Sequence, residues 1–418
     1  MIKNKYLKEN LNTNNILLIL IIVLPISLLS GSAIININVI LIDIIFLKII
    51  FFSKDRKMFN DSFINLLGFF YLSLIINIFF SNGDYITWKS QIGILRFFIL
   101  IYAFKYILNL NDYKNFNLII KSWLVIFVFV SLDLIFEFAF GFNLAGNSSY
   151  IPGRLSGFLG SELKIGNWYA GLVFLMSAYF LYKYKNSKIS LILLTGFLVI
   201  SFLIGERSNF IKIFIGFSLL LIFTNKISLN LKILTITIFI VSCSLLTLNN
   251  TNIKNRFFDQ IYFPVKNEGL TNYIMSSHYG VHYYTAYQIF KKNLIFGVGV
   301  KQFRYESYKE IYKENKYNIH ERDRWATHPH QIHMEFLSET GLFGYLSFSI
   351  FILTSITISI KNYLKSKNNY LLASTIFIII SMMPLIPSGS FFTTYSATIF
   401  WINFSFMVAL IGKKLNLK

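Results

Sequence analysis

Residues 231–248 read LKILTITIFIVSCSLLTL, an apolar run in which Lys232 is the one charged residue. A helix needs about 20 such residues to cross the hydrocarbon core of a bilayer, so the run predicts a membrane-spanning helix. Polar sequence then continues to residue 333, after which apolar sequence resumes. The pattern therefore predicts membrane helices on both sides of one long polar loop.

The rest of the chain has the same apolar character. Its 418 residues are 55% hydrophobic and 14% charged, with a mean hydropathy of +0.57. A soluble domain would not expose so much apolar surface, and the long continuous runs favour helices over the alternating strands of a membrane barrel. We expect an all-α polytopic membrane protein with about twelve transmembrane helices. The apolar runs lie at residues 15–33, 35–52, 62–80, 91–108, 117–140, 165–182, 189–204, 208–224, 231–248, 334–360, 369–386 and 392–412.

Charge and cysteine content exclude other classes. The net charge of +20 does not indicate nucleic-acid binding, because the basic residues gather in short loops, where they set membrane topology. Basic loops at 53–57, 183–188 and 361–367 fall on the same side as both termini, which we expect to be cytoplasmic. The basic start precedes an apolar run without a small-residue cleavage pattern, so we expect a retained first span. The single cysteine, Cys243, allows neither a disulfide framework nor a CxxC metal site.

This topology places the long loop outside the cytoplasm. We expect three parts: an N-terminal membrane bundle at 1–248, the outer loop at 249–333 and C-terminal membrane helices at 334–418. Within the loop, Tyr273 to Lys292 suits a helix lying at the membrane interface, and Phe303 to Tyr317 a second amphipathic stretch.

All six histidines fall between His278 and His333. We expect Thr327 or His328 to cap a helix that begins at Pro329, which would place His330 and His333 on one face. An imidazole at the outer membrane surface suits a general base. Zinc binding by the His-x-His-x-x-His spacing is a weaker alternative because it lacks a clear carboxylate ligand. A structural role is the other alternative, above all for His328, His333 and His320.

Outward-facing arginines are the second candidate group. Arg207 lies in a very short turn between two apolar runs, at a depth where a guanidinium is costly unless it meets an anion. The planar guanidinium suits phosphate, whereas snorkelling towards lipid headgroups is the alternative, strongest for Arg322 and Arg324. Asp133 and Glu137, one turn apart, are candidates to line a cavity, pair with an arginine or carry protons. The predicted substrate contacts are Arg154, Arg304, Arg324, His328, His278 and His282, the last two as wall or anchor residues.

Three motifs carry a family resemblance. Arg207 in its turn, Gly297-Val-Gly299 before Arg304, and His328-Pro-His-Gln with Glu-Thr-Gly ending at Gly341 occur in this order, and a late Pro- and Ser-rich segment at 384–392 follows. From about residue 150 onward the chain resembles the bacterial O-antigen ligase and polymerase family.

The resemblance implies a fold like the C-type glycosyltransferases, with the site between the outer loop and the bundle. It implies an undecaprenyl-pyrophosphate-linked glycan as donor, and no metal or nucleoside triphosphate. His330 matches the family's essential base, and Arg207 matches the arginine that handles the pyrophosphate. A second arginine is common upstream of the Gly-x-Gly element, but residues 277–282 contain none. Either Arg304 substitutes or the pyrophosphate is handled differently.

We therefore expect an inverting, metal-independent glycosyltransferase of the bacterial inner membrane, with its site on the periplasmic face. The long outer loop before the histidines favours a ligase that uses a lipid A-core hydroxyl as acceptor. The alternative is a polymerase that extends a glycan from the same donor, and some relatives use protein as acceptor. A transporter or flippase of lipid-linked glycans is more distant, because the sequence lacks the internal repeats typical of transporters. The expected partners are the donor, the acceptor and membrane lipids, and no nucleic acid.

Overall fold

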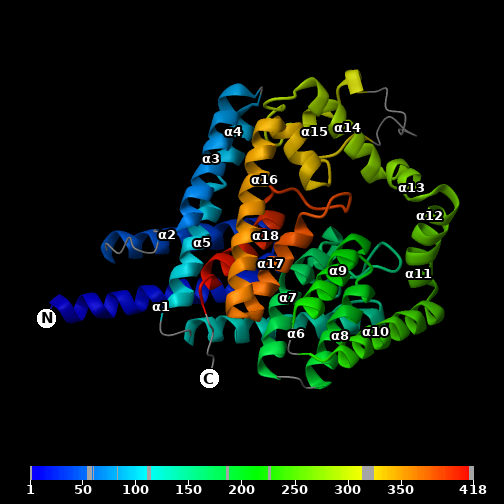
Figure 1. Ribbon diagram of the computed structural model, residues 1–418, viewed down its shortest axis with the longest axis horizontal. Coiled ribbons are helices and arrows are strands. Elements are labelled where there is room, and N and C mark those ends of the chain that lie inside the picture. The colour runs from blue at the N-terminus through cyan, green and yellow to red at the C-terminus, as the bar shows by residue number, and fades with distance from the viewer. Residues whose placement is uncertain are drawn as a thin grey trace.

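The computed structural model describes residues 2–53, 59, 61–81, 83–110, 114–184, 188–224, 227–312 and 324–413, with side chains from Asn12 onward. The described residues form helices joined by turns and irregular loops, without strands (Figure 1). His320 and Arg322 lie outside the described residues. The α-helices are α1 (Ile2–Leu29), α2 (Ser32–Ser53), α3 (Ser62–Phe80), α4 (Tyr85–Ile92), α5 (Leu95–Asn109), α6 (Lys114–Phe140), α7 (Ile165–Lys183), α8 (Lys188–Leu203), α9 (Arg207–Phe223), α10 (Leu229–Asn249), α11 (Thr251–Lys254), α12 (Phe263–Glu268), α13 (Leu270–Ser276), α14 (His278–Lys292), α15 (Phe303–Glu306), α16 (Ile332–Ser366), α17 (Asn369–Ser381) and α18 (Thr394–Leu410). Shorter helical turns are η2 (Gly157–Glu162), η3 (Asn255–Tyr262) and η4 (Glu310–Tyr312).

Each apolar run of the sequence overlaps a helix or, for 91–108, the pair α4 and α5, but the run at 369–386 extends beyond the end of α17 at Ser381. By length and composition, 7 helical segments among the described residues are apolar enough to cross a membrane, and α8, α17 and α18 are shorter apolar helices. The protein is thus a multi-pass, all-helical membrane protein. The count of twelve spans, the sidedness of the termini and the division into three parts remain predictions.

The core joins early and late helices. Trp401 of α18 is fully buried and contacts Phe97 and Phe98 of α5, with ring centroids 6.1 and 5.3 Å away. Its ring also lies 5.6 Å from that of Phe391, in the segment between α17 and α18. In a bilayer, close packing of this kind is the main force that holds helices together. Trp401 therefore supports the late Pro- and Ser-rich segment from beneath.

The outer loop forms a curved arm of short helices, drawn in green to yellow in Figure 1. The single interfacial helix expected from Tyr273 to Lys292 is wrong, because the chain breaks at Ser277 into α13 and α14. Ser277 caps α14 by accepting the Gly280 N–H at 3.2 Å. Gly280 lies so close to α13 that a β-carbon would approach the Ile274 carbonyl oxygen to 2.2 Å. The second predicted stretch contains α15 and η4, and its end lies outside the described residues.

Asp133 and Glu137 are buried near the end of α6, and they organise the loop between α6 and α7. Asp133 accepts the Leu144 N–H at 2.8 Å. Glu137 accepts the backbone N–H groups of Ser156 and Gly157 at 2.7 and 2.8 Å. Both carboxylates therefore hold the backbone of this loop in place by accepting its N–H groups. The sequence interpretation did not consider this role.

The Gly-Val-Gly element docks on a kink in α16. Gly341 interrupts this helix with φ 66° and ψ −169°, a conformation essentially restricted to glycine. Leu342 N donates to Leu294 O at 2.8 Å, and Gly299 N donates to Glu339 O at 2.8 Å. The backbones of the two motifs are thus hydrogen-bonded to each other on both sides of the kink.

Gly341→Ala should destabilise the protein by about 3 kcal/mol, because alanine avoids this conformation. Its β-carbon would also lie 2.3 Å from the Ile295 carbonyl oxygen. Thermal unfolding in detergent should show a lower melting temperature. Gly68→Ala in α3 is the control, since a β-carbon there meets nothing within 4 Å. Equal melting temperatures for the two variants would contradict this account of the kink.

Candidate functional site

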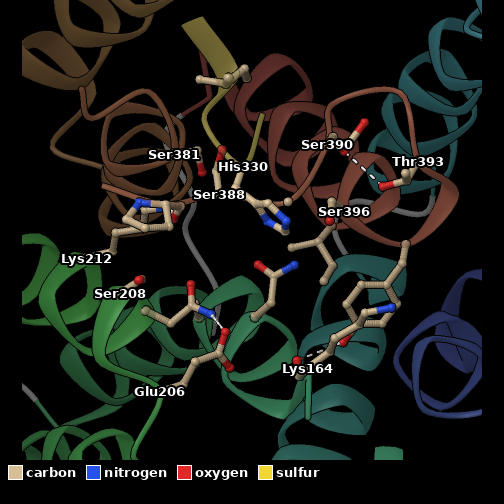
Figure 2. A pocket seen from close by; sticks show the side chains of 18 of the residues that line it. Lys164, Glu206, Ser208, Lys212, His330, Ser381, Ser388, Ser390, Thr393 and Ser396 are labelled. Atoms are coloured by element: carbon tan, nitrogen blue, oxygen red, sulfur yellow. Dashed lines mark hydrogen bonds between the residues drawn. The ribbon is translucent and has the colours of Figure 1, made fainter. Parts of the chain in front are cut away.

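A cavity of about 660 Å³ lies where α7, α9 and the outer loop meet the segment between α17 and α18 (Figure 2). Four separate stretches of sequence supply its charged and histidine residues. The charged and histidine residues that line it are Arg154, Glu162, Lys164, Glu206, Arg207, Lys212, Arg256, His328 and His330. The cavity therefore contains two of the predicted histidines and two of the predicted arginines.

His330 does not lie on a helix. Its φ is 57°, in the left-handed region, and its carbonyl accepts the Ser388 N–H at 2.7 Å. Gln331 then caps α16 by accepting the Met334 N–H at 2.8 Å. The predicted helix start at Pro329 is wrong, because the contact with Ser388 holds His330 in a left-handed turn of the loop ahead of the helix.

His333 does not line the cavity. Its Nε2 lies 2.8 Å from the Met382 carbonyl oxygen, and its Nδ1 lies 3.3 Å from the Tyr345 hydroxyl. His330 and His333 thus do not share a helix face, and His333 has the structural role that was one of its alternatives. Within the described ranges, no group of three His, Cys, Asp or Glu side chains is placed to hold a metal ion.

Three rings surround His330. The ring centroid of His328 lies 4.0 Å away, that of His282 lies 5.3 Å away in a stacked arrangement, and that of Tyr279 lies 5.5 Å away. Burial lowers the pKa of His330 to about 4. Burial, followed by the nearby His330 and His282, lowers the pKa of His328 to about 3. Both imidazoles are therefore neutral near pH 7, and a neutral imidazole has a lone pair that can accept a proton.

Arg154, Arg207 and Arg256 line the cavity together. Arg256 is 8% exposed, and its Nε donates to the Gly205 carbonyl at 3.0 Å. Burial, and then the positive charges of Arg207 and Arg154, lower the pKa of Arg256 to about 10. Glu206, whose carboxylate lies 3.7 Å from Arg154, offsets only part of this charge. The cluster is well suited to bind an anion with two phosphates.

Two glycines allow the arginines to meet. Gly205 has φ 69°, and a β-carbon there would lie 1.9 Å from the Gly153 carbonyl oxygen. A β-carbon on Gly153 would in turn lie 2.8 Å from Cδ of Arg256. Leu155 N donates to Ile204 O at 3.0 Å across the same contact. Backbone-to-backbone packing therefore brings three distant segments, each carrying one arginine, to the same wall.

Sequence reasoning missed Arg256. It sought the second arginine near residues 277–282 or at Arg304, whereas Arg256 lies at the start of the outer loop in the π-helical turn η3. Short π-helical segments often occur at functional sites. The sequence contained one signal, an arginine directly after the last span before the outer loop, but nothing in it indicated the contact with Gly205.

The other predicted contacts lie elsewhere. Arg324 is fully buried and donates from Nε and Nη2 to the carbonyls of Ser307 and Tyr308 at 2.9 and 3.3 Å, so it braces the loop. His278 is exposed at the start of α14, and Arg304 is half-buried. None of these three lines the cavity. His282 is also absent from the lining but stacks on His330.

The segment between α17 and α18 completes the wall opposite the arginines. Glu335 holds it by accepting hydrogen bonds from the Ser390 hydroxyl and, at 2.8 Å, from the Phe391 N–H. Lys212 of α9 donates to the Pro387 carbonyl at 2.8 Å. Among the described residues, the buried Ser388 Oγ and His328 Nε2 have no hydrogen-bond partner. Buried polar atoms of this kind are usually satisfied, which points to a polar ligand or water in the cavity.

The protein should become less stable as the pH decreases, because the buried imidazoles take up protons less readily in the folded state than in the unfolded chain. The folded pKa of His330 is about 4 and the ordinary value is 6.5, so the unfolded chain takes up a proton first as pH falls. The stability that His330 contributes is complete above roughly pH 6.5 and is lost progressively down to roughly pH 4, with about 2 kcal/mol lost at pH 5. Melting in detergent at pH 7 and pH 5 should therefore show a smaller loss for His330→Gln than for the wild type. Identical losses would contradict this.

Comparison with known proteins agrees with the geometry. The family model described as O-antigen ligase matches residues 189–349, a range that contains Arg207, Arg256 and His330. The comparison with curated proteins gives no match. Residues 189–349 are thus similar to the O-antigen ligase family model, and this match supports the resemblance of the chain to the O-antigen ligase and polymerase family.

Proposed function

We propose that the protein is a glycosyltransferase of the bacterial inner membrane that moves a glycan from undecaprenyl pyrophosphate to a lipid A-core hydroxyl on the periplasmic face. The observation that carries this proposal is that a neutral imidazole, His330, faces the same cavity as three arginines. The match of residues 189–349 to the O-antigen ligase family model supports the same chemistry. Both the donor and the acceptor class belong to the proposal.

The arginines act on the leaving group. The donor's two phosphates bind at Arg207 and Arg256, and Arg154 adds positive charge while it remains near Glu206. As the bond between the anomeric carbon and the phosphate oxygen breaks, negative charge grows on the pyrophosphate. Fixed guanidinium groups stabilise that charge without reorganising, which is electrostatic catalysis. Arginines thus supply the positive charge that the reaction needs.

His330 acts on the acceptor. Its free ring nitrogen takes the proton of the acceptor hydroxyl, the oxygen attacks the anomeric carbon, and the configuration inverts. A base with a pKa near 4 is weak, but the bound phosphates bring negative charge beside the ring. Negative charge favours the imidazolium and raises the pKa of His330 towards the working pH. Donor binding therefore activates the base.

His330→Ala should abolish glycan transfer, because removal of a general base costs about 10² to 10⁴ in rate. The assay uses purified protein in detergent, a polyprenyl-pyrophosphate glycan and an acceptor, with and without chelator and without any ion gradient. Size-exclusion chromatography checks that the variant is folded. Full transfer by His330→Ala would contradict the assignment of His330 as the base. Translocation of the lipid-linked glycan without transfer by the wild type would indicate a transporter.

The acceptor is tested in cells that lack the gene. Uncapped lipid A-core, together with polymer on the lipid carrier, is expected for a ligase. Lipid A-core that carries a single repeat would indicate a polymerase instead. Unchanged lipopolysaccharide and loss of a glycoprotein would indicate a protein acceptor.

Arg256→Gln should lower kcat/KM for the donor by about ten- to a hundredfold, since charged hydrogen bonds of this kind contribute about 1.5–3 kcal/mol. Arg256→Lys should also lose activity, because a point charge cannot replace the guanidinium fork. Arg304→Gln is the comparison variant, since Arg304 does not line the cavity. A larger loss in Arg304→Gln than in Arg256→Gln would make Arg304 the second phosphate ligand.

A further inference from the structure

The proposed function assigns residues to the donor pyrophosphate and to the acceptor hydroxyl. It assigns none to the sugar that lies between them. The pyrophosphate lies at Arg207 and Arg256, and the acceptor hydroxyl lies at His330. The anomeric carbon is bonded to the pyrophosphate and is attacked by the acceptor hydroxyl. The sugar ring that contains this carbon must therefore lie between the arginines and His330, and the following inference rests on that assignment.

Tyr279 stands at this position. It lines the cavity, and its ring lies 5.5 Å from the ring of His330 at an interplanar angle of 67°. Arg256 lines the same cavity. Tyr279 is 40% exposed, whereas its neighbours Gly280 and Val281 are buried.

The backbone beneath Tyr279 is held firmly. The residue lies in the first turn of α14, where Ser277 accepts the Gly280 N–H. One turn later, Tyr283 is buried and donates from its hydroxyl to the Leu385 carbonyl at 3.4 Å. The helix is thus tied to the segment that also holds His330, so the Tyr279 ring and the base keep their relative positions.

We propose that Tyr279 is the stacking platform for the pyranose that carries the scissile bond. A pyranose has one face of C–H groups, and these carry the partial positive charge that the negative face of an aromatic ring attracts. The hydroxyl groups at its edge meet a polar wall that includes Ser388 and Ser396 (Figure 2). The unsatisfied Ser388 Oγ and His328 Nε2 offer hydrogen bonds to these hydroxyls. Tyr279 therefore selects sugars with an uninterrupted C–H face.

The test compares binding of one lipid that carries the sugar with binding of one that does not. The probes are polyprenyl pyrophosphate and polyprenyl-pyrophosphoryl N-acetylglucosamine, and binding to the full-length protein is measured in detergent. Because the bare lipid ends in a phosphate monoester with one more ionisable oxygen, each variant is compared with the wild type for the same lipid. Tyr279→Ala should weaken binding of the sugar-bearing lipid about tenfold, the size of one aromatic contact, and leave the bare lipid unaffected. Tyr279→Phe should behave as the wild type.

Tyr287→Ala is the matched control. Tyr287 lies on the same helix and is 45% exposed, but it does not line the cavity, and Lys291 lies over its ring. This variant should bind both lipids normally. Equal weakening of both lipids by Tyr279→Ala, or no weakening of the sugar-bearing lipid, would overturn the platform while the proposed function stands. Failure of the wild type to bind even bare polyprenyl pyrophosphate would instead refute the proposed donor.

Discussion

The close approach of Gly153 to Gly205 is the contact on which the site depends. Neither position tolerates a side chain, because a β-carbon on either would overlap backbone or the Arg256 stem. Three guanidinium groups repel one another, and Glu206, which lies 3.7 Å from Arg154, offsets only part of that repulsion. Rigid backbone packing, supported by Glu137 from beneath the first loop, supplies the free energy that opposes this repulsion. The protein thereby holds positive charge ready for an anion before that anion arrives.

Buried carboxylates repeat the same principle elsewhere. Glu137 and Glu335 are buried and accept backbone N–H groups from loops that border the cavity, and the buried Glu339 accepts the Lys301 N–H beside the Gly-Val-Gly element. Backbone groups near the apolar interior cannot rely on water, so irregular segments need internal acceptors. These glutamates serve the loops as caps serve helices. This explains why so few acidic residues suffice to organise a site made largely of loops.

The sequence predicted those features that depend on local pattern. Hydropathy located the long helices, and motif context selected Arg207 and His330 from their neighbours. Prediction from the sequence failed where contacts between distant backbone segments determine the local structure. The bond from Ser388 to His330 shifts the start of α16 from Pro329 to Ile332, and the contact of Arg256 with Gly205 joins residues far apart in the chain. Tyr279 was invisible for the same reason, since its position depends on the break at Ser277.

The order of the segments around the cavity has a consequence for biosynthesis. The three arginines of the cavity lie between residues 154 and 256, and the facing wall at Pro387 to Ser396 follows them in the chain, so it is synthesised later. Until α18 inserts and Trp401 packs against α5, His330 lacks the Ser388 contact that holds its backbone. A chain that stops before α18 therefore contains the three arginines but lacks the contact that fixes the His330 backbone. The cavity is complete only after α18 has been made and inserted.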